Sequence, residues 1–441
     1  MKIYTLLLFT FFFSTAFSQK QTATYLQQYK FRTPNFRSAL VSGNANGGFG
    51  TSEGLGNAYN FSFNPKFEAV KIVSTDNILA TNTYEIAAGF NHNKYNFATG
   101  GHLNTNFNYS ITQSALKKNY THSHYVLTGF STVLKQSFVK STNNYMKQDN
   151  LGLGSVSYTV GFGKGRIENV TDAQMAYNIL NNLKKNNLLT TGFSDDDVIG
   201  LAKTITEINN TRLFDFRRKH IFEIKQIDSF LNTKGLIKEK NIDYFTTVND
   251  NWFYAFNELR RHGKEKFISL TPLLGLDNTK NIFNTIPIDS LSKSFSKFAL
   301  LTLSVGIENT KALSVKKQFN KGLTLNTIYG YSMNKYTNNT VINNSTGSNI
   351  LSNLVGYLQW GYYPTTRTNI NTTISNNLIW DYGFQFNNNT FLSLAGNYFV
   401  NYNTRIFLNL YSNFSVAKNS NADYNAAVAA SFAFGFQHYL R

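Results

Sequence analysis

The sequence predicts a transmembrane antiparallel β-barrel of about fourteen strands, within a range of twelve to sixteen, and an α-helical module inserted midway. Three observations predict this class. Long segments alternate apolar and polar residues with period two, short and long connections alternate between them, and the chain ends in an aromatic-rich strand. A soluble sandwich of two sheets is the alternative that the alternation by itself allows.

The alternation defines the individual strands. In residues 405–414, Ile406, Leu408 and Leu410 fall on one face and Asn409 on the other. Six strands are expected before residue 164 and eight after residue 264, at 39–51, 57–72, 78–90, 100–112, 122–136, 150–163, 265–275, 295–317, 322–336, 349–362, 367–379, 385–399, 404–416 and 424–440. Long polar loops are expected between some of them, including 277–294. An even count places both termini on the periplasmic side.

The N-terminus has the pattern of a secretory signal peptide. Lys2 supplies a positive charge, residues 4–13 are apolar, and Ala16 to Ser18 provide a cleavage site. We therefore expect residues 1–18 to be removed on export, and the mature protein to reside in the cell outer membrane. The chain contains no cysteine, which excludes a disulfide framework and a thiolate site.

Charge divides the chain into three parts. Residues 164–266 contain 17 Lys+Arg and 14 Asp+Glu, whereas the two flanks together contain 25 and 10. A segment with so many charges does not fit the hydrocarbon layer. The predicted division is a first barrel part at 19–163, a helical periplasmic insertion at 164–264 and a second barrel part at 265–441.

Apolar residues at helical spacing predict that the insertion is α-helical. Met175, Ile179 and Leu183 form one such stripe. Ser194, followed three residues later by Asp197, is a variant of the capping box and predicts the start of another helix.

A glycine-rich stretch, Gly161, Gly163 and Gly165, precedes the insertion. Strand, glycine-rich turn and helix is the order found in nucleotide-binding folds, but the spacing fits neither the P-loop nor the dinucleotide fingerprint. We expect these glycines to permit a close backbone approach or a bend, and to act as the hinge to the helical module.

Other candidate chemical sites are weak. His122 and His124 share a strand face but lack a third metal ligand, and residues 195–197 are three aspartates without the spacing of a calcium loop. Neither a G-x-S-x-G nor an H-E-x-x-H motif occurs. We expect no enzymatic activity, no cofactor and no bound metal.

The basic excess suggests a role in transport. If the side chains of Lys316, Lys317, Arg367 and Arg405 line the lumen or its rim, they favour anions. The alternative is that such residues contact lipid phosphates or only solvate the loops.

The segments "GKGRIENVTDAQMAYNILNNLKK", "SDDDVIGLAKTITEI" and "RLFDFRRKHIFEIKQIDSFL" resemble the helical insertion of some outer-membrane barrel proteins of Bacteroidota. The signal ending "FSQ" and the strands rich in Asn, Tyr and Phe are also similar. The resemblance implies an outer-membrane location and carries no catalytic or substrate-binding residues with it.

Two functions follow as hypotheses. The first is a porin-like channel for small polar or anionic solutes, with the helical insertion as a partial plug or gate. The second is a non-conducting outer-membrane anchor or complex subunit, whose insertion docks a periplasmic protein. The expected partners are outer-membrane lipid, lipopolysaccharide and the barrel-insertion machinery, and no nucleic acid.

Overall fold

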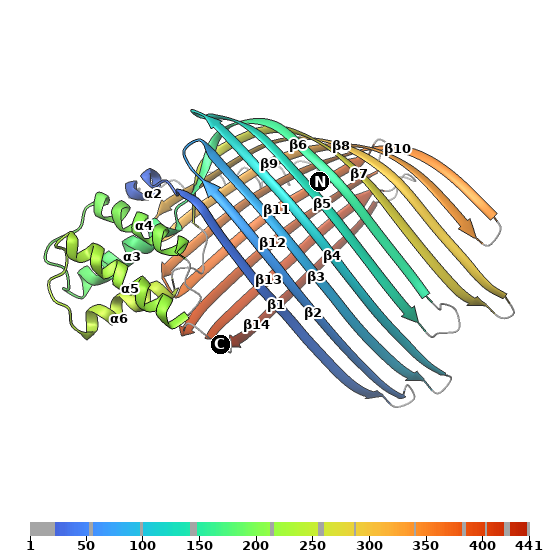
Figure 1. The fold of residues 1–441 in the computed structure, drawn as a ribbon, viewed down its shortest axis with the longest axis horizontal. Helices are drawn as coiled ribbons and strands as arrows, with labels where there is room; N and C mark the ends of the chain where they lie inside the picture. Colours follow the sequence, from blue (N-terminus) through green and yellow to red (C-terminus); the bar gives the residue numbers. More distant parts are fainter. Residues whose placement is uncertain are drawn as a thin grey trace.

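Fourteen antiparallel strands follow one another without a crossover, and a group of helices lies at one end of the sheet that they form (Figure 1). The structure is a computed structural model. It describes residues 23–52, 56–97, 100–141, 148–211, 216–254, 260–285, 288–338, 341–381, 385–401, 404–418 and 424–438. The expected signal peptide lies outside these residues.

The strands are long and pair only with their sequence neighbours. Their bounds are β1 Thr33–Ser52, β2 Gly56–Ser74, β3 Ile78–Phe97, β4 Gly100–Thr121, β5 His124–Ser141, β6 Gln148–Asn169, β7 Arg261–Thr285, β8 Ile288–Ser314, β9 Lys317–Asn338, β10 Val341–Thr365, β11 Thr368–Asp381, β12 Phe386–Asn401, β13 Thr404–Lys418 and β14 Tyr424–His438. The predicted fourteen-stranded antiparallel sheet with an inserted helical module is confirmed.

In the described part of the chain, one short helix precedes β1 and four longer helices lie between β6 and β7. They are α2 Thr24–Gln28, α3 Thr171–Lys185, α4 Asp195–Asn210, α5 Phe216–Thr233 and α6 Ile242–Tyr254. No helix in the described part of the chain is long and apolar enough to cross a membrane. β6 extends six residues beyond the boundary expected at residue 163, so the helical part is shorter than the expected insertion 164–264.

The two ends of the sheet differ in their connections. At the helical end, the described β4–β5 and β8–β9 connections are tight turns of two residues. At the other end, the expectation of a long polar loop at 277–294 is wrong. There β7 and β8 continue as a paired hairpin up to Thr285 opposite Ile288, because polar residues also form a ladder when the backbone remains in register.

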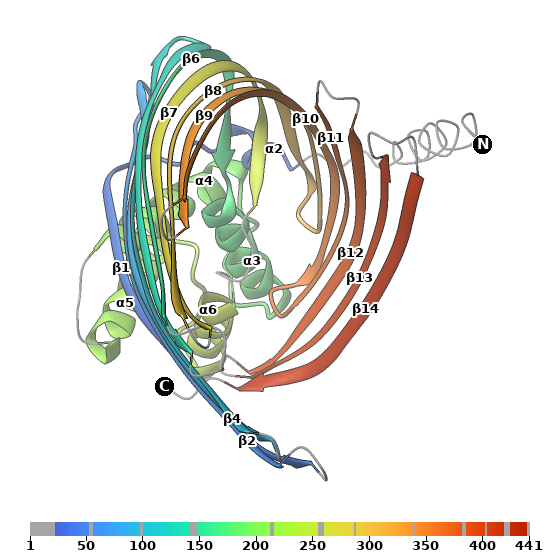
Figure 2. The ribbon, with the colours of Figure 1, turned by 90° about the vertical axis from the view of Figure 1, so that its right-hand side faces the viewer.

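The sheet rolls up so that its strands surround a central space (Figure 2). Pairing runs in order from β1 to β14. Within the described residues β1 and β14 are not paired with each other, so they form the two edges of the rolled sheet.

The convex face of the sheet is apolar. Along β7, Ile268, Leu270, Leu274 and Leu276 lie at alternate positions that share this face, and each is between 39% and 66% exposed. The same holds for the described outward positions of β8 and β9, such as Leu303. Large apolar side chains in this number on one surface exceed what a soluble monomer normally exposes.

The concave face carries polar and charged side chains that meet across the curve. Lys118 on β4 forms an ion pair with Glu265 on β7, although two strands lie between them. Tyr125 on β5 donates a hydrogen bond to the same carboxylate at 2.6 Å. Contacts between non-neighbouring strands identify this face as the inner one, because curvature brings inner side chains together and separates outer ones.

Glycines on the inner face seat the aromatic rings of neighbouring strands. The ring of Tyr125 lies where a Cβ on Gly163 would be, and Phe298 covers Gly275 in the same way. Gly161 lies against Ser269 with equally little room. Neither Gly161 nor Gly163 has a positive φ, so both lie in regular strand and serve close packing. Their role as a hinge stays a prediction.

The backbone changes its course at two glycines near the ends of β6 and β7. Gly165 has φ +94° and Gly263 has φ +137°, values that L side chains rarely adopt. A Cβ on either residue would overlap a carbonyl oxygen of the opposite strand. These two residues mark the point at which the paired strands approach the helices.

Replacement of Gly163 with valine should destabilise the sheet by roughly 1–3 kcal/mol, because the Tyr125 ring must move away from residue 163 and lose its hydrogen bond to Glu265. Urea denaturation followed by circular dichroism measures the change. Gly154→Val on the same strand is the matched control, since a Cβ there meets no atom within 4 Å. Equal destabilisation by both substitutions would contradict the packing role of Gly163.

Candidate functional site

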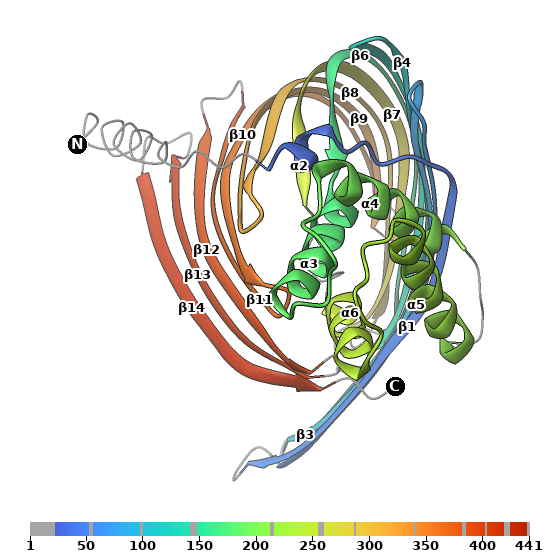
Figure 3. The same ribbon diagram turned by 90° about the vertical axis from the view of Figure 1, so that its left-hand side faces the viewer.

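The helices lie across the end of the sheet at which the chain enters β1. Viewed from that end, α3 and α6 stand in front of the central space, and α5 lies toward the side of β1 (Figure 3). Seen from the opposite end, α3 and α6 appear within the ring of strands (Figure 2). We call α2 to α6 the mouth module and the adjoining end of the sheet the mouth.

The mouth module has an apolar core of its own. The predicted stripe is confirmed, since Met175, Ile179 and Leu183 on α3 are all at most 1% exposed. They pack with Leu201 and Ile205 of α4 in the same cluster. Complete burial of a side chain of this size stabilises a fold by roughly 1.5–3 kcal/mol, so the core can hold the helices together.

The start of α4 follows the sequence prediction. The Ser194 hydroxyl accepts a hydrogen bond from the Asp197 amide at 3.2 Å, and the Asp197 carboxylate accepts one from the Ser194 amide at 2.9 Å. Residues 195–197 thus form the acidic first turn of a helix, where negative charge is favourable. Their use at a helix start accounts for the three aspartates.

The segment before β1 belongs to the mouth module, which the sequence did not reveal. Tyr25, Leu26 and Tyr29 are at most 5% exposed and lie in the core formed by α3 and α4. The Thr24 hydroxyl donates a hydrogen bond to Asp195 at the start of α4. The chain is therefore packed into the mouth module before it enters the first strand.

A buried carboxyl group lies beneath this N-terminal segment. Asp172 is 6% exposed, and its carboxylate accepts a hydrogen bond from the Thr206 hydroxyl at 2.6 Å. The Tyr29 hydroxyl forms a hydrogen bond with the same Thr206. Burial raises the pKa of Asp172 to about 6, and the hydrogen bonds from Thr206 and Tyr29 oppose this rise only in part.

Arg260 joins the mouth module to the sheet. It is 1% exposed and immediately precedes β7. Its guanidinium group donates to the carbonyl oxygens of Ser314 at 2.9 Å and Val315 at 2.8 Å, in the β8–β9 turn. It also lies 4.6 Å from the centre of the Tyr363 ring on β10. One side chain therefore connects the entrance of β7 with three other strands or their turn.

The backbone of Arg260 makes a second connection, to α3. Its carbonyl oxygen accepts from the Val170 amide at 2.8 Å, and its amide donates to the Thr171 hydroxyl at 3.0 Å. Ala312 of β8 is 1% exposed within the core of the mouth module. The core of the module thus continues onto the sheet.

Two contacts hold the mouth module at other points of the rim. Arg367, in the β10–β11 turn, forms an ion pair with Asp250 of α6. The Thr33 hydroxyl at the start of β1 donates to Asn210 at the end of α4 at 2.6 Å. The side chains of Arg367 and Asp250 are 36% and 43% exposed, so this pair contributes little stability in water.

The four basic residues singled out in the sequence all lie at the mouth. Lys316 belongs to the β8–β9 turn and is exposed, and Lys317 is the first residue of β9. Arg405 lies near the start of β13 and donates to Gln437 of β14 at 2.8 Å. Arg367 lies in the β10–β11 turn and pairs with Asp250 of α6, so the four side chains occupy separate parts of the rim, and the structure does not gather them into one ring.

Charges alternate in sign on the inner face. Lys66 forms ion pairs with Glu68 at 3.1 Å and with Glu85 at 2.9 Å. Arg261 pairs with Glu308 at 2.9 Å, near the mouth. Where the inner cations have carboxylate partners of this kind, they present little net positive field to a solute.

A second polar network, which the sequence did not indicate, braces the mouth between β2, β4 and β6. The Arg166 guanidinium donates to the Ser74 hydroxyl at 2.8 Å and lies 4.9 Å from the centre of the Tyr120 ring. Arg32 pairs with Glu168 at 2.9 Å and with Asp76 at 2.8 Å. Only their position at predicted strand ends could have drawn attention to these residues.

The histidines considered as metal ligands lie in a turn. His122 has φ 57° in the β4–β5 connection and His124 begins β5. In the described part of the chain, no group of three or more potential ligands lies close enough together to hold a metal ion.

Comparison with known proteins yields only remote structural likeness. Neither a protein-family model nor a curated protein sequence matches the chain. The similar solved structures include the translocator domain of autotransporter NalP from Neisseria meningitidis, at 7% identity and a TM-score of 0.30, covering 83% of this chain and 89% of that one.

Two further structures are similar at the same level. The ferric yersiniabactin uptake receptor FyuA from Yersinia pestis has 6% identity and a TM-score of 0.37, covering 92% of this chain and 73% of that one. The toluene transporter TodX from Pseudomonas putida has 7% identity and a TM-score of 0.33, covering 96% and 95%. Likeness of this degree does not transfer a function to the present chain.

The mouth module should become more stable as the pH falls. Asp172 has a folded-state pKa of about 6, above the ordinary value of 3.8, so folding favours its protonated form. That contribution is complete below pH 4 and is lost as the pH rises through 6. Asp172→Asn should therefore raise the free energy of local opening of α3 and α4 at pH 7.5 by roughly 2–3 kcal/mol, and it should remove the pH dependence of that free energy. Amide hydrogen exchange at pH 5 and 7.5 measures it, and an unchanged pH dependence would contradict the assignment.

Loss of the Arg260 guanidinium should loosen the mouth module from the sheet. Arg260→Met keeps an apolar stem but leaves the turn carbonyls without these donors. The substitution should lower the free energy of unfolding of the mouth module by roughly 2–4 kcal/mol. Limited proteolysis should then cleave between α3 and α6 much faster than in the wild type. Arg367→Met is the control and should have a small effect, because its ion pair is partly exposed. Equal protection in both variants would show that Arg260 is not the anchor.

Proposed function

We propose that the protein is an outer-membrane channel for small polar solutes, and that the mouth module is its partial plug or gate. The observation that carries the proposal is the contrast between the two faces of the rolled sheet. The convex face presents apolar side chains and the concave face presents polar and charged ones. That arrangement suits lipid outside and water inside.

The dimensions of the apolar band support a membrane location. On β7 the outward residues from Ile268 to Leu276 are apolar, with Lys266 before them and Lys280 after them. A stretch of nine residues agrees with the roughly 9–11 that a tilted strand needs to cross the hydrocarbon layer. On β9, Lys321 and Lys335 bracket the band in the same way.

Lipid would also require the two edges of the sheet to be satisfied. Unpaired backbone groups are costly in a medium without water. The outward residues of β14, Phe432, Phe434 and Phe436, are between 72% and 77% exposed at one edge. We expect β1 and β14 to pair with each other in the membrane and so close the barrel.

The choice of solute follows from the inner face. Lys66 with Glu85, and Lys118 with Glu265, place opposite charges side by side. Asn and Gln side chains, such as Asn320 and Gln359, form hydrogen bonds with each other on the same face. This lining favours polar solutes generally, and a preference for anions would depend on the rim residues Lys316, Lys317, Arg367 and Arg405.

A second function has one observation in its favour. Ile221, Ile242 and Phe245, on α5 and α6 of the mouth module, are 45%, 78% and 44% exposed. Exposed apolar side chains on a water-facing module suit contact with another protein. The alternative is therefore an anchor or complex subunit that does not conduct and whose helices dock a periplasmic protein.

Planar-bilayer conductance of a cross-linked variant tests the gate. Because the chain has no native cysteine, Asp250→Cys with Arg367→Cys gives a unique pair for a short bis-maleimide. Bridging should fix α6 to the rim and reduce the open fraction of the channel relative to the unbridged variant. Each single-cysteine variant, treated with the same reagent, is the control. Equal conductance before and after bridging would reject the gate.

Removal of the helices separates the two functions. A chain lacking residues 170–262 should conduct steadily if the mouth module obstructs a pore. A barrel that remains sealed after this deletion, while the intact chain captures a periplasmic protein, would support the anchor instead.

A further inference from the structure

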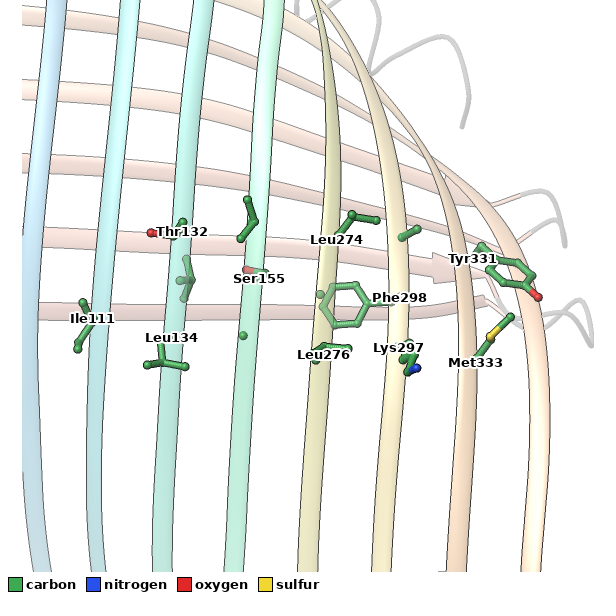
Figure 4. A pocket seen from close by; sticks show the side chains of 15 residues that line it. Ile111, Thr132, Leu134, Ser155, Leu274, Leu276, Lys297, Phe298, Tyr331 and Met333 are labelled. Atoms are coloured by element: carbon green, nitrogen blue, oxygen red, sulfur yellow. The ribbon is translucent and has the colours of Figure 1, made fainter.

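An apolar pocket lies on the convex face of the sheet, away from the mouth. Its volume is about 810 Å³, and it crosses β4 to β9 (Figure 4). Two neighbouring cross-strand rows line it. One row runs Ile111, Leu134, Gly154, Leu276, Lys297, Met333, and the next runs Thr132, Val156, Leu274, Ala299, Tyr331.

Small residues form the floor of the pocket between larger walls. A Cβ on Gly154 would meet no atom within 4 Å, so open space lies above this residue. Leu134 and Leu276 flank it in the same row and are 48% and 51% exposed. A floor of glycine and alanine between leucines has the shape and chemistry to accept a hydrocarbon chain.

Lysines gather at the end of the pocket that lies farther from the helices. Lys297 occupies the pocket beside Leu276 and Met333 (Figure 4). Lys335 lies one cross-strand row beyond it, opposite Phe295, and Lys280 lies directly opposite Lys293 one row further on. Successive rows on one face are about 7 Å apart, so flexible lysine side chains from all three can reach one headgroup.

Among the described side chains, the four lysines have no acidic partner on their own face. Within the described residues none of Lys280, Lys293, Lys297 and Lys335 forms an ion pair with the protein. The outward positions of 268–280, 293–307 and 323–335 contain neither Asp nor Glu. Like charges directly opposite each other on a sheet repel, which an external anion would relieve.

We propose that this face binds one phosphate-bearing glycolipid of the outer leaflet. One acyl chain of the lipid lies over Gly154, and the phosphates of its headgroup lie between the four lysines. The proposal rests on the proposed membrane location of the protein. Charge complementarity favours an anionic headgroup, and the adjoining apolar pocket requires that the headgroup carry a hydrocarbon chain. A free phosphate ion would leave the pocket without an occupant.

Native mass spectrometry of protein extracted from vesicles tests the site. The vesicles contain phosphatidylcholine with a few per cent of either lipid A or its dephosphorylated form. Wild-type protein should retain lipid A, and the variant K280Q/K293Q/K297Q/K335Q should retain roughly tenfold less or lower still, since each lysine near an anionic surface contributes. The matched control K264Q/K266Q/K311Q/K321Q removes four lysines near the mouth and should retain the wild-type amount.

A second variant tests the pocket independently of charge. Gly154→Leu has room for its side chain and fills the floor, so it should reduce lipid A retention while all four lysines remain. Inorganic phosphate at millimolar concentration should not displace the lipid. Displacement by phosphate, or equal retention by the four-lysine variant and its control, would overturn the proposal.

Insertion is measured separately in each sample, by protection of the strands from protease. Protein that fails to insert into any vesicle contradicts the membrane location itself. Protein that inserts normally but shows no preference for the phosphorylated lipid contradicts only the lipid site.

Discussion

Each strand of this sheet places alternate side chains in different surroundings, and the rest of the architecture depends on that constraint. A shift of one residue between two strands would exchange Leu270 on the convex face with Ser269 or Thr271 of the concave face. The register therefore needs fixed points. Tyr125 over Gly163 and Phe298 over Gly275 supply them, because a ring seated on a glycine fits only one partner position. The glycines thus act in the wall of the barrel itself.

The mouth module depends on the same register. Arg260 reaches the carbonyl groups of Ser314 and Val315 only while β7 and β8 remain correctly paired. The core of the module also contains Tyr25 from the segment before β1 and Ala312 from β8. Residues that precede the first strand and a residue near the end of the eighth strand are therefore buried in one cluster. Helices assembled from such distant parts of the chain are secured to the sheet at several points, which is consistent with the proposed role as a plug.

Local sequence patterns were sufficient to predict the strands and helices. Period-two alternation and the alternation of short and long connections predicted the fourteen strands, and the stripe through Met175 and the Ser194 cap predicted helices. The sequence could not show which residues meet across the fold. Arg260 looks like any basic residue before a strand, and Tyr29 like any aromatic residue in a linker. Their roles arise from contacts with residues more than fifty positions away. The prediction of a loop at 277–294 was wrong for a related reason, since polar composition does not prevent backbone pairing.

The positions of the basic side chains change the interpretation of the net positive charge. A net charge of +18 in the chain suggested an anion-attracting lumen. The inner face instead pairs Lys118 with Glu265 and Arg261 with Glu308, while outward lysines border the apolar band at both ends. In the proposed membrane location, cations at those depths lie where lipid phosphates lie, and their long stems can cover apolar surface while the ammonium groups remain in the headgroup layer. In the proposed membrane location the outward lysines therefore face lipid phosphates, and a solute of the proposed channel would meet a lining in which these charges compensate each other.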